Sequence, residues 1–175
     1  DAVHTVLEKA TEFLISYISA FKEAGADGVV IAEPLAGLLS PKMNREFSVP
    51  YFKKIVDTLQ TEEFSVIYHN CGNTVMDLLD DIFSLNAAAY SFGDCLDMAK
   101  VLEKAPIDAL CLGNISPAGQ FAGGTPESIY KETTALLQAA ADKDNFIISS
   151  GCDIPPHAKW ENILSFFEAV KAFKA

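Results

Sequence analysis

Residues 65–69 read Ser-Val-Ile-Tyr-His, a short and almost continuously apolar run that is typical of a buried strand. A helical pattern follows from Thr74 to Leu85, and a weaker strand is predicted from Ala87 to Phe92. Two strands joined through a helix are typical of a parallel sheet with helices on its faces. This stretch therefore predicts one strand–helix–strand unit of an α/β fold.

The same alternation continues in both directions from this unit. An amphipathic helix is predicted from Val3 to about Ala24, because apolar residues recur there along one stripe at helical spacing. The other expected elements are strands at 28–33, 109–112 and 146–150, and helices that begin at Ser40-Pro41, 94, Thr125-Pro126 and 160. We expect residues 1–175 to form a single α/β domain of about five β/α units. A doubly wound open sheet and part of a barrel fit this pattern equally well, but no G-x-G-x-x-G turn indicates a dinucleotide site.

The composition is that of a soluble globular protein. Half of the 175 residues are hydrophobic, which is too large a share for a disordered chain. The net charge of −11 argues against a nucleic-acid surface, which needs clustered Lys and Arg. No apolar run reaches the roughly 18 residues of a membrane-spanning helix, and no signal peptide is recognisable, so we expect a cytoplasmic protein without a membrane partner. The start at Asp1 instead of Met suggests that the true N-terminus is absent.

Four cysteines in a reducing compartment are expected to be free or metal-bound rather than bridged. Cys95 and Cys111 have apolar neighbours in the sequence, so both are predicted to be small buried side chains. Cys71 and Cys152 differ from them, because each follows the end of a predicted strand.

These two cysteines and a histidine form a candidate metal site. His69 and Cys71 are two residues apart at a strand end, so strand geometry places both side chains on one face. Cys152 follows the last strand, and in a parallel barrel such strand ends share one rim. One imidazole and two thiolates suit zinc and leave a fourth position open for chemistry. The residue types alone also allow a simpler arrangement, in which two buried cysteines lie near a capping histidine.

Four short strings stand at or near the ends of predicted strands and the starts of predicted helices. They are Tyr68-His69-Asn70-Cys71-Gly72, Gly113-Asn114-Ile115-Ser116-Pro117, Gly124-Thr125-Pro126-Glu127, and Ser150-Gly151-Cys152-Asp153-Ile154-Pro155-Pro156 with Glu161-Asn162 following. As a set they resemble the uroporphyrinogen decarboxylase superfamily, and within it most closely the corrinoid-dependent methyltransferases. The fold that this resemblance implies is the (β/α)8 TIM barrel. This chain would then be the C-terminal part of such a barrel, with the N-terminal β/α units missing.

The resemblance also implies a reaction. In the corrinoid-dependent methyltransferases an H-x-C pair and a later cysteine hold a catalytic zinc, and here they match His69, Cys71 and Cys152. A thiol such as coenzyme M binds zinc in its deprotonated form at neutral pH. Its sulfur would then take the methyl group from a methylated corrinoid, which a separate partner protein must carry because nothing in this chain resembles a corrinoid-binding domain.

Four further residues are candidates for the same site. Related enzymes place a glutamate at the end of the strand after H-x-C as a fourth zinc ligand, whereas this chain has Phe92-Gly93-Asp94 there. Asp94, Glu33 or a water molecule can take that place, and the two acids are predicted as catalytic groups. Asp153 and Asn114 are predicted on the cofactor-binding side, where Asp153 can orient a ligand of the metal. The simpler interpretations are a solvated Glu33, an Asp153 that caps its own loop, and an Asn114 that fixes its own turn.

Three other functions compete with this hypothesis. A metal-free decarboxylase of the uroporphyrinogen type would not need H-x-C and the late cysteine. A zinc enzyme like cobalamin-independent methionine synthase fits the string Gly151-Cys152-Asp153-Ile154-Pro155-Pro156 less well. A half-barrel that only associates with a partner is the third, because five units leave open sheet edges and an unfilled interior. We therefore expect self-association into a homo-oligomer, or a partner chain that supplies the missing strands.

Overall fold

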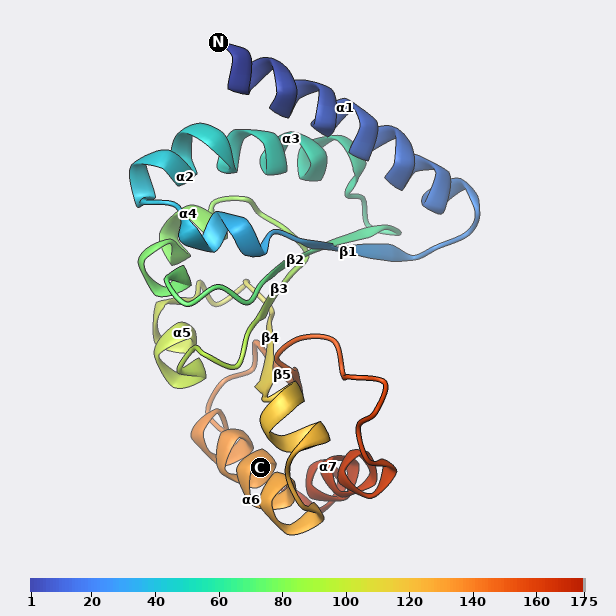
Figure 1. Cartoon of the computed structure of the whole chain (residues 1–175), viewed down its shortest axis with the longest axis vertical. Coiled ribbons are helices and arrows are strands. Elements are labelled where there is room, and N and C mark those ends of the chain that lie inside the picture. Colours follow the sequence, from blue (N-terminus) through green and yellow to red (C-terminus); the bar gives the residue numbers. More distant parts are fainter. Residues whose placement is uncertain (175) are drawn as a thin grey trace. The chain divides into compact units, whose positions relative to one another are not determined.

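Strands and helices alternate along the whole chain in the computed structural model, which describes residues 1–174 (Figure 1). The strands are β1 (Gly28–Ala32), β2 (Ser65–Asn70), β3 (Ala89–Phe92), β4 (Cys111–Ile115) and β5 (Phe146–Ser150). The α-helices are α1 (Ala2–Glu23), α2 (Pro41–Phe47), α3 (Val49–Leu59), α4 (Leu79–Phe83), α5 (Met98–Lys104), α6 (Pro126–Ala139) and α7 (Trp160–Ala172). Short turns of other helix types are η1 (Pro34–Leu38), η2 (Val75–Asp77) and η3 (Pro117–Ala122). This order confirms the predicted α/β class.

The contacts divide the chain into two compact units, Asp1–Tyr90 and Ser91–Ala175. In the first unit β1 and β2 are parallel, with Ala32 beside His69. In the second unit β4 and β5 are parallel, with Asn114 beside Ser149. Both pairs are joined through helical crossovers, as parallel pairing requires. The expectation of a single domain over residues 1–175 stays a prediction.

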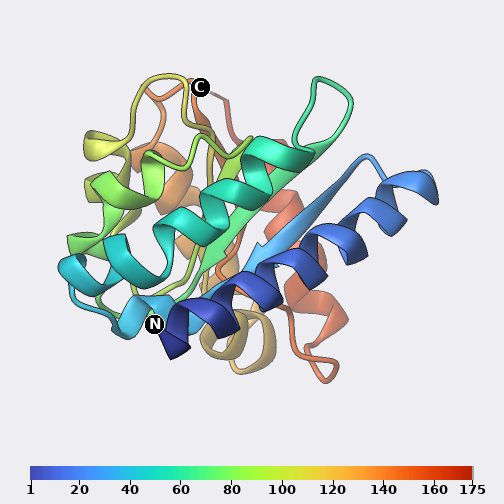
Figure 2. The ribbon, with the colours of Figure 1, turned by 90° about the horizontal axis from the view of Figure 1, so that it is seen from above.

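The core of the first unit lies between its strands and the helices α1 and α3, which run alongside one another (Figures 1 and 2). Phe52 of α3 packs edge-on against Tyr68 of β2, with ring centroids 4.9 Å apart. The helix predicted to begin at Ser40-Pro41 does so, and the Ser40 hydroxyl accepts a hydrogen bond from the Met43 N–H. It is divided at Ser48, because Pro50 has no N–H with which to continue the helix.

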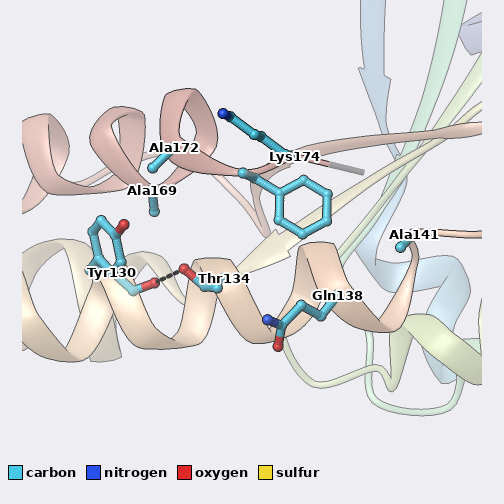
Figure 3. Close-up of a pocket in the computed structure, with 8 residues that line it drawn as sticks. Tyr130, Thr134, Gln138, Ala141, Ala169, Ala172 and Lys174 are labelled. Atoms are coloured by element: carbon cyan, nitrogen blue, oxygen red, sulfur yellow. Dashed lines mark hydrogen bonds between the residues drawn. The ribbon is translucent and has the colours of Figure 1, made fainter.

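The core of the second unit lies between β4, β5 and the paired helices α6 and α7. Its buried cluster is Ile115, Phe121, Ile129 and Phe166, against which Ile148 of β5 packs. Small residues of α7 allow it to approach α6 closely, since Ala169 is buried and points toward α6 (Figure 3). The Thr134 hydroxyl of α6 donates to the carbonyl of Tyr130 one turn earlier, at 2.9 Å, so this polar side chain is satisfied within its own helix (Figure 3).

Two predictions around β3 were wrong. The helix expected from residue 94 begins only at Met98, because the Asp97 side chain accepts hydrogen bonds from the backbone of Ala99 and Lys100 and so fixes the start of α5. Cys95 therefore lies in a loop, and it is exposed where we expected a buried side chain. Cys111 is buried as predicted.

The outward face of α1 carries a second apolar stripe, which includes Val6, Phe13 and Tyr17. These side chains are 67%, 66% and 54% exposed, so the stripe is open on the described part of the chain. Apolar surface of this kind is compatible with the predicted self-association, which stays a prediction. Within residues 1–174, none of the helices combines the length and the apolar content needed to cross a membrane.

Candidate metal centre

His69 and Cys71 lie together at the carboxyl end of β2 in the first unit. Their ligating atoms are within 4.8 Å of each other, so one ion can contact both. Side chains alternate along β2, and Tyr68 faces the helical layer through its contact with Phe52. His69, one residue later, therefore faces the opposite side of the strand pair. The predicted placement of the H-x-C pair on one face agrees with this geometry.

Asn70, between these two residues, is completely buried and holds the loop in place. Its side-chain nitrogen donates to the Glu33 carbonyl at 2.7 Å and to the Tyr68 hydroxyl at 2.9 Å. Its side-chain oxygen accepts from the Gly72 N–H at 2.8 Å. A Cβ atom at Gly72 would lie 2.9 Å from the Cα of Gly37, so the close backbone approach expected from this glycine is present.

Glu33 follows β1 and points toward the helical layer of the first unit. The Ser48 hydroxyl lies 2.9 and 2.8 Å from its two carboxylate oxygens, and the side chain lines a small cavity between β1, α1 and α3. Burial raises the pKa of this carboxyl, and the hydrogen bond from Ser48 opposes the rise. Burial raises the pKa of Tyr68, and the nearby Glu33 carboxylate raises it further. The structure thus groups Glu33 with Ser48 and Tyr68, whereas His69 and Cys71 make a separate pair.

The raised pKa of Glu33 predicts a dependence of stability on pH. A raised pKa means that ionisation is harder in the native state than in the unfolded chain, so native stability falls as pH rises through the raised value. Glu33→Gln keeps an oxygen for Ser48 and cannot ionise. We expect its free energy of unfolding, measured in urea, to match the wild type near pH 4 and to exceed it increasingly toward pH 7. Glu62→Gln, at an exposed glutamate of the same unit, controls for the loss of one negative charge. A constant difference between Glu33→Gln and wild type at every pH would contradict the prediction.

Cys152 follows β5 in the second unit, with Asp94 close to the preceding residue. A Cβ atom at Gly151 would lie only 2.6 Å from the Asp94 backbone nitrogen, so the loop after β3 packs directly on Gly151. Asn114 holds this loop, because its side-chain nitrogen donates to the carbonyls of Gly93 and Leu96 at 2.8 and 2.7 Å. Asp94 therefore lies near the segment that carries Cys152. The prediction that Asp94 can serve as the fourth zinc ligand requires such a position. Asp153 is exposed in the same segment.

The sequence pattern placed His69 and Cys71 at one strand end, but it did not indicate the side chains that hold the segment around them. Neither the role of Asn70 inside the H-x-C string nor that of Ser48 beside Glu33 followed from the pattern. The proposed turn-fixing role of Asn114 was close to what the structure has, except that it fixes the loop of the neighbouring strand and not its own turn. An asparagine inside a motif at a strand end was the available signal, since its amide can satisfy several backbone groups.

Comparison with known proteins gives the family. Residues 1–173 match the profile described as uroporphyrinogen decarboxylase. The chain belongs to the uroporphyrinogen decarboxylase family. One member, the methylcobamide:CoM methyltransferase MtbA of Methanosarcina mazei, is 28% identical over 177 residues, covering 99% of this chain and 50% of the relative. Another, the uroporphyrinogen decarboxylase of Christiangramia forsetii, is 29% identical over 173 residues, covering 99% and 49%.

A solved structure of similar sequence has the same fold. It is a methyltransferase from Methanosarcina mazei, which superposes with a TM-score of 0.83 at 28% sequence identity over 95% of this chain and 48% of the other. Both the predicted resemblance and the predicted α/β fold are confirmed. The chain spans about half the length of the curated relatives it matches, which agrees with the predicted partial barrel.

Proposed function

We propose that this chain is part of a zinc-dependent methyltransferase, which moves a methyl group from a methylated corrinoid protein to a small thiol such as coenzyme M. The observation that carries the proposal is the His69–Cys71 pair, whose ligating atoms lie within 4.8 Å of each other at the end of β2. A relative of this chain is named as a methylcobamide:CoM methyltransferase, which supports the same donor and acceptor classes here.

The donor set fits zinc. We assign the imidazole of His69 and the thiolates of Cys71 and Cys152 as the three protein ligands, and a nitrogen–sulfur set of this kind prefers zinc to hard cations such as magnesium. Three ligands leave a fourth position for the substrate sulfur. When bound, zinc would act as a Lewis acid and keep a thiol in its reactive thiolate form at neutral pH, although the ordinary pKa of a thiol is about 8.5.

The proposed methyl transfer needs neither a nucleophile from the protein nor a redox partner. The substrate sulfur forms a bond to the methyl carbon, the cobalt–carbon bond breaks, and its electron pair stays with cobalt. The thiol proton leaves to solvent or to a nearby base. Of the two predicted catalytic acids, Asp94 suits a role at this site better, because it lies against Gly151 and is exposed. The Glu33 carboxylate is held by Ser48 on the helical side of the strands. Glu33 therefore suits an indirect role, in which its backbone carbonyl accepts the hydrogen bond from Asn70.

Metal content and methyl transfer test this proposal together. We expect about one zinc per chain by elemental analysis after reloading of metal-free protein. Methylcobalamin and coenzyme M serve as probes of the donor and acceptor classes, and we expect zinc-dependent loss of the methyl–cobalt absorbance with equal consumption of thiol. A protein that takes up no zinc when it is offered the metal would overturn the proposal.

A metal-free decarboxylase is the second candidate, because a uroporphyrinogen decarboxylase is also among the relatives, at 29% identity. It predicts release of carbon dioxide from uroporphyrinogen with or without a chelator. It gives no reason for a histidine and a cysteine to place their ligating atoms together at the end of β2, and for this reason we place it second.

A further inference from the structure

Asn70 occupies a special place relative to the proposed zinc ligands. It lies between His69 and Cys71 in the sequence, and none of its surface is exposed. Because side chains alternate along β2, Asn70 points to the same side as Tyr68, with whose hydroxyl it bonds, and away from the face of His69 and Cys71. It therefore cannot itself be a ligand of an ion on that face.

The amide of Asn70 ties together three separate pieces of backbone and side chain. Its nitrogen reaches the Glu33 carbonyl, just after β1, and the Tyr68 hydroxyl within β2. Its oxygen reaches the Gly72 N–H, one residue beyond Cys71. One side chain thus links the end of β1, the Tyr68 hydroxyl and the backbone after Cys71, and both of its polar atoms are used.

Other contacts also hold this segment, so Asn70 acts within a segment that is tied at several points. The η1 turn packs on the loop after β2, where a Cβ atom at Gly37 would lie 2.9 Å from the Cα of Gly72. The Thr74 hydroxyl donates to the Gly37 carbonyl from the other end of the loop. The Glu33 N–H also donates to the His69 carbonyl at 2.9 Å. Asn70 completes this arrangement at the point between the two ligands.

We propose that Asn70 is a positioning residue, which orients His69 and Cys71 for the metal by tying their segment to the Glu33 carbonyl, the Tyr68 hydroxyl and the Gly72 N–H. This inference rests on the proposed zinc function. Residues that orient metal ligands without touching the metal change affinity by about 10–100-fold when they are replaced. We expect a loss of zinc affinity in that range for Asn70→Ala, with a changed ligand geometry at the metal.

Two variants and a matched control test the role. Asn70→Ala removes the whole amide. Asn70→Asp keeps the shape and the oxygen that accepts from Gly72, but it places an oxygen against the Glu33 carbonyl where a donor stood. The control is Asn162→Ala in α7, since Asn162 is equally buried and its amide donates to the carbonyls of Gln120, Phe121 and Gly124, none of which adjoins a proposed ligand.

The measurements are zinc affinity by competition with a chromophoric chelator, the visible spectrum of the cobalt(II)-substituted protein, and urea unfolding of each metal-free variant. We expect both Asn70 variants to lose affinity and to change the thiolate-to-cobalt charge-transfer bands. Asn162→Ala should lose stability and keep the affinity and spectrum of the wild type. If Asn70→Ala does not fold, Asn70→Asp decides the question.

The outcomes separate this inference from the proposed function. Wild-type affinity and spectra in the folded Asn70 variants would overturn the positioning role alone. Equal losses in the Asn70 and Asn162 variants would also overturn it, because they would show a general effect of destabilisation. A wild-type protein that binds neither zinc nor cobalt would overturn both the inference and the function on which it rests.

Discussion

Cys71→Ser is expected to weaken zinc binding by roughly a hundredfold or more. Structural zinc sites bind with about 10–16 kcal/mol shared among four ligands, so one ligand accounts for about 3 kcal/mol, or about two orders of magnitude in affinity. A serine hydroxyl is a poor replacement because it stays protonated at neutral pH, whereas a cysteine binds as the thiolate. Chelator competition on the reloaded protein measures the change, and Cys152→Ser should behave in the same way if Cys152 is the third protein ligand.

Cys111→Ala is the matched control for this experiment. Cys111 is buried in β4, and burial raises the pKa of its thiol to about 12, so it carries no thiolate at neutral pH. Its removal should leave zinc affinity unchanged. If Cys71→Ser bound zinc as tightly as the wild type while Cys111→Ala lost binding, the metal would have to be assigned to other residues.

The parts of the fold that sequence predicted well are those with a strong local signal. The strand at 146–150 matches β5 at both ends, and Ser40 caps its helix as expected. The start of α5 was missed because two aspartates compete for it: Asp94 and Asp97 both precede the helical pattern, and only hydrogen bonding shows that Asp97 is the cap. The burial of Cys95 was predicted wrongly for the same reason, since moving the helix start left this residue in an exposed loop.

The candidate site shows the same division between local and distant information. The two-residue spacing of His69 and Cys71 is a local pattern, and strand alternation was enough to place them together. The partners of Asn70 and Glu33 are distant, since Asn70 bonds to a carbonyl 37 positions away and Ser48 reaches Glu33 across 15 positions. No periodicity in the sequence encodes such pairs. The direction in which Glu33 points could therefore not be predicted, although its place after a strand could.

Phe121→Ala is expected to cost about 3–5 kcal/mol of unfolding free energy, which is the usual range for removing a fully buried aromatic ring. Phe121 is 1% exposed, and its ring lies 5.4 Å from that of Phe166 in the core of the second unit. The surrounding residues come from η3, β4, α6 and α7, so they cannot easily close on the cavity. The substitution leaves the Phe121 carbonyl available to Asn162, so the effect can be assigned to lost packing. Urea unfolding followed by circular dichroism measures it.

Phe167→Ala provides the comparison, because this phenylalanine also packs on Phe166, with ring centroids 5.2 Å apart, but is 51% exposed on α7. Water can fill the space that its ring leaves, so we expect a loss below about 1 kcal/mol. A typical domain has only about 5–15 kcal/mol of stability, and the Phe121 variant should therefore unfold at much lower urea concentration than the Phe167 variant. Equal losses at the two positions would mean that the ring of Phe121 is not enclosed in solution. The α6–α7 layer would then need the rest of the barrel, or a partner, to pack as it does here.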